Sequence, residues 1–136
     1  MQTLSFTIAI QPITKKNSID LHIIKDRTGK QRVIPSPSKR YKKYEDDCWP
    51  FIPQPEKPID TPVNIEARFY MQTRRLVDLV NLQEALLDIL VKYGVLKDDN
   101  SRVVVSMDGS RVLYDKDNPR TEVCISEVEV MNVWDE

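Results

Sequence analysis

The sequence contains few of the residues that build common metal and disulfide sites. It has two cysteines, Cys48 and Cys124, and a single histidine, His22, among 136 residues. The cysteines are far apart and neither belongs to a CxxC pair, which argues against a disulfide framework or a zinc site and favours two reduced thiols. His22 has no companion at a metal-ligand spacing, so we assign it no role.

The chain also lacks a long hydrophobic run. No apolar segment approaches the length needed to cross a bilayer, so we expect no membrane span. The first ten residues, MQTLSFTIAI, alternate polar and apolar side chains without a basic start or a small-residue cleavage site, which indicates a strand and not a signal peptide. We therefore expect a cytoplasmic protein, and 136 residues suit a single domain with a modest core.

Charge is distributed unevenly along the chain. The net charge is −1, but residues 15–43 carry ten Lys/Arg and two Asp, while the remainder carries ten basic and nineteen acidic residues. A basic arm thus accompanies an acidic body. Such segregation fits a surface that neutralises phosphates, although a solvated basic loop explains the charge almost as well.

Composition divides the single domain into three parts. The basic arm covers residues 14–44. Residues 50–62 hold five prolines, which predicts an irregular connector. Residues 63–130 form the core that carries the candidate metal site described below.

Hydrophobic periodicity predicts an amino-terminal hairpin, several further strands and two main helices. The expected helices are a basic one over residues 39–49 and a longer one over 79–93, which begins at Asp78 and ends at Gly94. The expected strands cover residues 4–10, 21–24, 31–34, 63–71, 102–107 and 122–130, and a polar loop separates the last two.

The longer helix has two notable faces. Its polar flank carries Asn81, Glu84, Asp88 and Lys92. Leu87 and Val91 emerge on a different side from the main apolar stripe. That side could meet a second subunit or widen the surface that faces the core, and the sequence leaves both interpretations open.

Acidic residues gather at both ends of this helix. Asp78 lies at its start, and Asp98 and Asp99 follow its end. Clustered carboxylates suit Mg²⁺, which can activate water for phosphodiester hydrolysis. The helix is about 22 Å long, so the acids meet only if the chain folds back along it. The simpler interpretation is that Asp78 caps the helix and Asp98 and Asp99 make a turn.

The segment RRLVDLVNLQEALLDILVKYGVLKDDNSRVV resembles the central signature of RusA-type crossover junction endodeoxyribonucleases. The matching positions are Asp78, Asn81, Leu82, Gly94, Asp98 and Asp99, and weaker similarity extends over most of the chain. The resemblance implies a RusA-like α+β fold with a small mixed sheet. It also implies a homodimer that nicks four-way (Holliday) DNA junctions symmetrically in recombination and repair. It implies Mg²⁺, for which Mn²⁺ can substitute, and it implies Asp78, Asp98 and Asp99 as catalytic metal ligands.

Two positions depart from the family pattern. Better-known members have a second aspartate where this chain has Val80, and a lysine where it has Glu84. We expect Glu84 to replace the missing ligand, with Asp88 and Asp108 as other candidates. Alternatively, Glu84 and Asp88 belong to an exposed helix face.

DNA contacts are expected from the basic arm and from the start of the signature, because phosphate charge supplies most sequence-independent affinity. The candidates are Lys15, Lys16, Asn17, Arg74, Arg75 and Asn81. Weaker candidates on the basic helix are Lys39, Arg40, Lys42 and Lys43.

Three functions remain open. The leading hypothesis is a metal-dependent junction endonuclease. The alternative is a module that binds branched DNA but has lost cleavage, because Val80 replaces a family aspartate. A hydrolase of a small phosphorylated metabolite would need a concave pocket near Asp78 and would leave the basic arm without a function.

Overall fold

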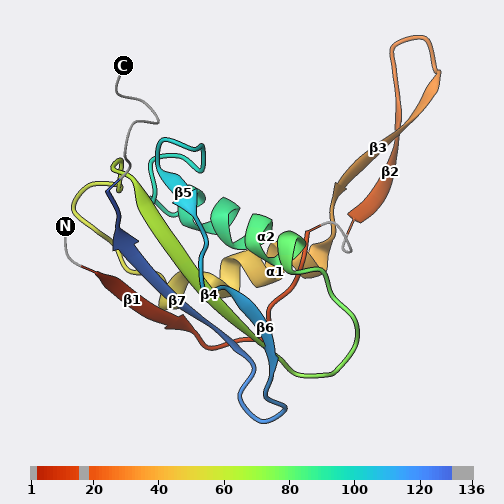
Figure 1. Ribbon diagram of the computed structural model, residues 1–136. Helices are drawn as coiled ribbons and strands as arrows, with labels where there is room; N and C mark the ends of the chain where they lie inside the picture. Colours follow the sequence, from red (N-terminus) through yellow and green to blue (C-terminus); the bar gives the residue numbers. More distant parts are fainter. Residues whose placement is uncertain (1–2, 16–18, 130–136) are drawn as a thin grey trace.

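The computed structural model describes residues 3–15 and 19–129. A mixed sheet forms the body, in the order β1 (Leu4–Ile8), β7 (Arg120–Glu127), β4 (Val63–Met71) and β5 (Val104–Ser106), and β6 (Arg111–Tyr114) also pairs with β4. The pairs β1/β7 and β7/β4 are antiparallel, whereas β5 and β6 run parallel to β4. Both helices lie against one face of this sheet (Figure 1), so the predicted α+β fold is confirmed.

The central strand β4 carries one half of the core. Every second residue from Val63 to Met71 is buried, and the intervening ones are exposed or half-buried. This alternation matches the prediction and has a simple cause, since successive side chains of a strand point to opposite faces. The buried side chains belong to the same apolar cluster as those of the two helices.

The longer helix, α2 (Leu79–Lys92), supplies the other half. It buries Leu82, Ala85, Leu86, Ile89 and Leu90. Gly94 follows with φ +77°, a conformation that suits glycine at a helix end. Leu87 and Val91 are half-buried and pack against the core, so they widen the core-facing surface.

The basic helix, α1 (Lys39–Cys48), begins at Ser38, whose Oγ accepts a hydrogen bond from Tyr41 N at 3.1 Å. Tyr41, Tyr44 and Cys48 are buried, and their spacing of three and four residues places them on one face of the helix. Both cysteines are free thiols.

The proline-rich connector is irregular, as expected, apart from a short 3-10 helix, η1 (Trp49–Phe51), at its start. Two apolar side chains fasten it to the body. Ile52 is buried, and Ile59 makes a parallel bridge to Leu96. The connector is therefore part of the domain surface.

The amino-terminal hairpin consists of β2 (Ile19–Lys25) and β3 (Gln31–Pro37), and it projects from the body (Figure 1). Its turn is closed by Asp26, whose Oδ1 accepts hydrogen bonds from the backbone N–H groups of Thr28 and Lys30, both at 2.9 Å. Gly29 adopts φ +81° in this turn, a conformation that suits glycine.

The prediction of one continuous polar loop between the last two strands was wrong. Strand β6 lies inside that segment and pairs in parallel with residues 68–71 of β4. Its four residues lie mostly on the surface, so the sequence shows no alternation of buried and exposed positions, and only the pairing with β4 makes the segment a strand. Among the described residues, no helix is long and apolar enough to cross a membrane.

Candidate functional site

Asp78 occupies the N-cap position of α2 without capping it. Its backbone is extended (φ −86°, ψ 124°), but its side chain accepts no capping hydrogen bond from the helix backbone. Instead, Asn81 Nδ2 donates to Asp78 Oδ2 at 3.2 Å. The carboxylate is exposed at the positive end of the helix dipole, where a negative charge is favoured. The simpler interpretation of Asp78 as a helix cap is therefore not supported.

The two acids beyond α2 differ in what they contact. Asp98 builds the turn, since its Oδ1 accepts from Asp99 N at 2.7 Å and its Oδ2 accepts from Asn100 Nδ2 at 3.2 Å. The Asp99 side chain is exposed and makes no hydrogen bond or ion pair with a described residue. Asp98 thus stabilises the turn, as the simpler interpretation predicted, whereas the Asp99 side chain remains available as a ligand.

The chain after α2 is fixed at the carboxyl end of the helix. The N–H groups of Val95 and Leu96 both donate to Leu90 O, and both side chains are buried. Asp98 and Asp99 follow directly. The helix has 14 residues, which corresponds to about 21 Å, and Asp78 lies at its other end.

The signature acids are consequently not collected into one cluster within the described chain. Among the described residues, no group of three or more Asp, Glu, His or Cys side chains is placed to hold a metal ion. Carboxylates have the chemistry that Mg²⁺ prefers, but the arrangement within a single copy does not complete a coordination shell.

The polar flank of α2 forms a second acidic region. Burial raises the pKa of Asp88 above its ordinary value, and the carboxylates of Asp99 and Glu84 raise it further, while the Lys15 ammonium opposes them. Lys15 Nζ lies 3.8 Å from Asp88 Oδ2. Asp99 therefore lies near Asp88, which is ten residues, or about 15 Å, along the helix from Asp78.

Val80, at the position of the missing family aspartate, is 61% exposed in the first turn of α2. Leu76, just before Asp78, is fully exposed. The surface around Asp78 is thus partly apolar, and position 80 itself offers no ligand for a metal ion.

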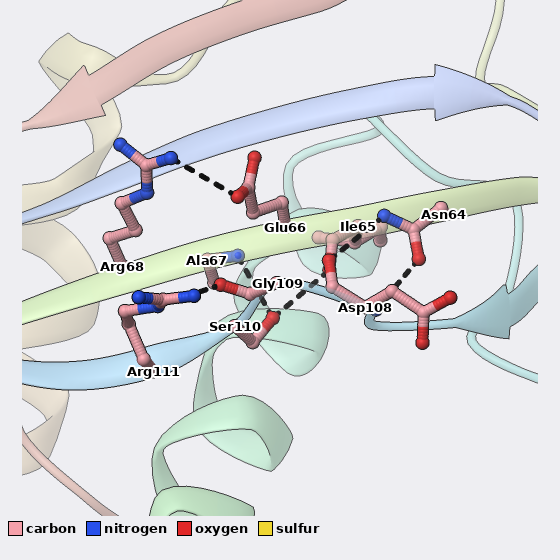
Figure 2. Close-up of polar contacts among 9 residues, drawn as sticks. All are labelled: Asn64, Ile65, Glu66, Ala67, Arg68, Asp108, Gly109, Ser110 and Arg111. Atoms are coloured by element: carbon pink, nitrogen blue, oxygen red, sulfur yellow. Dashed lines mark hydrogen bonds and ion pairs between the residues drawn. The ribbon is translucent and has the colours of Figure 1, made fainter.

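Asp108 lies at the opposite end of β4 from Asp78. Figure 2 shows the turn that carries it, which is held by Asn64: Asp108 N donates to Asn64 Oδ1 at 2.7 Å, and Asn64 Nδ2 donates to Asp108 O at 3.2 Å. The Asp108 carboxylate points away from β4 (Figure 2). Asp108 is therefore not placed to assist Asp78 within one copy.

The same turn contains contacts that sequence reasoning missed. Ser110 Oγ accepts from Ala67 N at 3.0 Å and donates to Ile65 O at 3.2 Å, so this hydroxyl replaces a backbone partner where β4 has no parallel neighbour (Figure 2). Gly109 has φ +86°, and a Cβ there would lie 2.6 Å from Glu66 Oε1. The sequence DGS signals a turn, but not its docking on β4.

The predicted DNA contacts fall into three groups. Lys16 and Asn17 lie outside the described residues. Arg74 stacks over the Tyr114 ring at 4.1 Å, and Lys15 faces Asp88 as described above. Arg75 lines a cleft of about 350 Å³ that we call the arginine cleft, together with residues 11–14, Arg40, residues 71–73 and residues 76–77.

The basic residues of α1 are exposed. Lys43 pairs with Asp47 at 2.6 Å, and Lys42 lies on the surface outside the arginine cleft. Lys39 is also exposed. Of the weaker candidates, Arg40 is therefore the one that the structure places beside a predicted contact, Arg75.

A family model described as Endodeoxyribonuclease RusA matches residues 10–126. The match includes β4, α2 and the turn that follows, together with the hairpin and α1. No curated protein matches the chain.

Proposed function

Because this chain belongs to the RusA endodeoxyribonuclease family, we propose that it binds four-way DNA junctions and nicks them with a bound Mg²⁺. The observation that carries the proposal is the Asp78 carboxylate, which stands exposed at the start of α2 without a capping function and is held by Asn81. A carboxylate at this position can act on a substrate, because its oxygens accept no hydrogen bond from the helix backbone.

We further propose that the active form is a homodimer in which two copies share each metal site. The support is geometric: Asp78 and Asp99 lie at opposite ends of α2, and no described group of three acids forms within one copy. If both acids bind one cation, they must come from different copies. A twofold axis then produces two equivalent sites, as symmetric nicking of opposing strands requires.

In this arrangement, Asp78 of one copy and Asp99 of the other would hold the cation, with Asp98 beside Asp99. Glu84 is exposed on the same flank of α2 as Asn81 and is the proposed replacement for the family aspartate at position 80. A bound Mg²⁺ would supply a Lewis acid for the phosphodiester and lower the pKa of a water ligand.

A second function is favoured by one observation. Position 80 carries an exposed Val, and the described acids of one copy do not form a metal cluster, so a module that binds junctions without cutting them fits the same residues. The two functions differ in whether the bound junction is cleaved.

The deciding experiment incubates the purified protein with a labelled synthetic four-way junction, with Mg²⁺, with Mn²⁺ and with a chelator. We expect paired nicks in opposing strands with either metal. Asp78→Asn should abolish nicking while binding persists, and Asp117→Asn, an exposed aspartate in the turn between β6 and β7, should not. Junction binding without nicking in any metal would favour the binding module.

The shared site has its own test. Mixing Asp78→Asn with Asp99→Asn should restore part of the nicking that each variant lacks alone, because one mixed site of the heterodimer keeps both acids. If both variants are inactive and their mixture remains so although subunits exchange, the two acids do not bind one cation across the dimer.

A further inference from the structure

We propose that the arginine cleft binds the phosphodiester backbone of one DNA strand and that Arg40 contacts a phosphate there. This inference rests on the proposed function and specifies the path by which a strand reaches Asp78. Arg40 comes from α1 and lies outside the central signature, so the resemblance to the family does not assign it this role.

The cleft has walls from two loops that are far apart in sequence. The loop after β1 contributes residues 11–14, and the last residue of β4 with the loop that follows contributes residues 71–73 and 75–77. Gln72 N donates to Gln11 Oε1 at 2.8 Å, which ties the two loops together. Figure 1 places the second loop directly before α2, so the cleft ends at the residue that precedes Asp78.

The charged residues that line the arginine cleft are basic. Arg40 and Arg75 enter from different elements, both are exposed, and none of the described residues that line the cleft is acidic. Neither guanidinium forms an ion pair with a described residue, whereas Lys43 pairs with Asp47 and Lys15 with Asp88. Two guanidinium groups without a carboxylate partner are suited to a phosphate, which they can bind in a bidentate manner.

The cleft continues past Arg40. A second hollow of about 230 Å³ shares Gln11, Ile13 and Arg40 with the first. It adds Lys43 and Asp47, whose charges pair with each other, so Arg40 is its one charged residue without an ion-pair partner among the described residues. Arg40 thus lies between two adjoining hollows. This favours an extended polynucleotide backbone over a small phosphorylated metabolite, because a metabolite would occupy one enclosed pocket.

The test compares Arg40→Gln with Lys42→Gln, which removes the same charge two residues away on α1 but lines neither hollow. Junction affinity is measured by fluorescence anisotropy with a chelator present, over a range of salt concentrations. We expect Arg40→Gln to weaken binding about tenfold and to reduce the slope of log K against log salt by about one. Lys42→Gln should change affinity about twofold or less.

A second measurement locates the contact. A single phosphate of the junction is replaced by a neutral methylphosphonate, one position at a time. At the phosphate that Arg40 contacts, the replacement should weaken binding by the wild type as much as the Arg40→Gln substitution does. Binding by the Arg40→Gln variant should be weakened no further by the same replacement. Because Arg40 is exposed, the circular dichroism and the melting temperature of the variant should match those of the wild type.

The outcomes separate this inference from the proposed function. If the wild type nicks junctions and Arg40→Gln binds as Lys42→Gln does, the cleft has no such role although the endonuclease proposal stands. The inference is also overturned if, at every methylphosphonate position, the loss of affinity adds to the loss caused by Arg40→Gln. A wild type that neither binds nor cuts a junction overturns both.

Discussion

The amide of Asn81 lies 3.2 Å from Asp78 Oδ2 and donates a hydrogen bond to it across the first turn of α2. The helix therefore holds the carboxylate through a side chain and leaves its own backbone N–H groups out of the contact. This relationship gives Asn81 a positioning role toward Asp78.

Asn81→Ala should slow junction nicking more than it weakens junction binding. Loss of a group that orients a metal-binding carboxylate typically lowers activity about 10–100-fold. Single-turnover cleavage gives the rate, and anisotropy with a chelator gives the affinity. Gln83→Ala, two residues further along α2, is the matched control. If affinity and rate fall by the same factor, Asn81 contacts DNA and does not act through Asp78.

Gly109→Ala should destabilise the protein more than Gly29→Ala. Both glycines have positive φ, but the space around Gly29 is open, whereas a Cβ at Gly109 would lie 2.6 Å from Glu66 Oε1. We expect each substitution to cost about 1 kcal/mol for the backbone conformation, and Gly109→Ala to cost about 1 kcal/mol more. Urea denaturation gives the free energies of unfolding.

The Glu66 contact can be tested directly. In a Glu66→Ala background, the additional cost of Gly109→Ala should disappear, because the carboxylate that meets the Cβ has been removed. An additional cost that persists in this background would mean that backbone strain at Gly109, and not the contact with Glu66, separates the two glycines.

Periodicity predicted the elements that make most of the core. Strand β4 alternates over nine residues and α2 repeats apolar side chains over four turns, so local pattern and tertiary packing agree. Strand β6 was missed because its four residues depend on β4 for their pairing. The turn at Gly109 and Ser110 docks on residues more than forty positions earlier, and no local pattern encodes such a contact.

The candidate site was predictable in its members but not in its arrangement. The predicted start of α2 placed Asp78 at the N-cap position. That its side chain accepts no hydrogen bond from the helix backbone depends on a local geometry that the sequence does not reveal. Where Asp99 lies depends on how Val95 and Leu96 pack under α2. The ion pair of Lys15 with Asp88 joins segments separated by most of the domain, so it could not be inferred from spacing.

Ser110→Ala should destabilise the fold by about 1–3 kcal/mol, because Ala67 N would lose its hydrogen-bond partner in a partly buried place. Ser5→Ala is the control, since Ser5 is an exposed residue of β1. Urea denaturation measures both. If the two variants are equally stable, a water molecule replaces the hydroxyl and the docking of the turn does not depend on it.

The pH dependence of stability should reveal the ion pair of Asp115 and Arg120. Arg120 Nη1 donates to Asp115 Oδ2 at 2.8 Å, and this bond, with a second one from Asn118 N, holds the pKa of Asp115 below its ordinary value. A carboxyl group with a lowered pKa binds its proton less tightly in the folded state than in the unfolded state. Its contribution to stability is therefore present above the ordinary value and is lost as the pH falls through the lowered pKa.

Asp115→Asn should consequently be less stable than the wild type at pH 7, and the difference should shrink on acidification and vanish in strong acid. Urea denaturation at a series of pH values gives the difference in the free energy of unfolding. Asp117→Asn is the control, because it changes a neighbouring carboxylate of the same turn without breaking the Arg120 bond. A destabilisation by Asp115→Asn that stays constant from neutral to acidic pH would mean that Asp115 acts through the shape of the turn, since only a charged carboxylate loses its advantage when it is protonated.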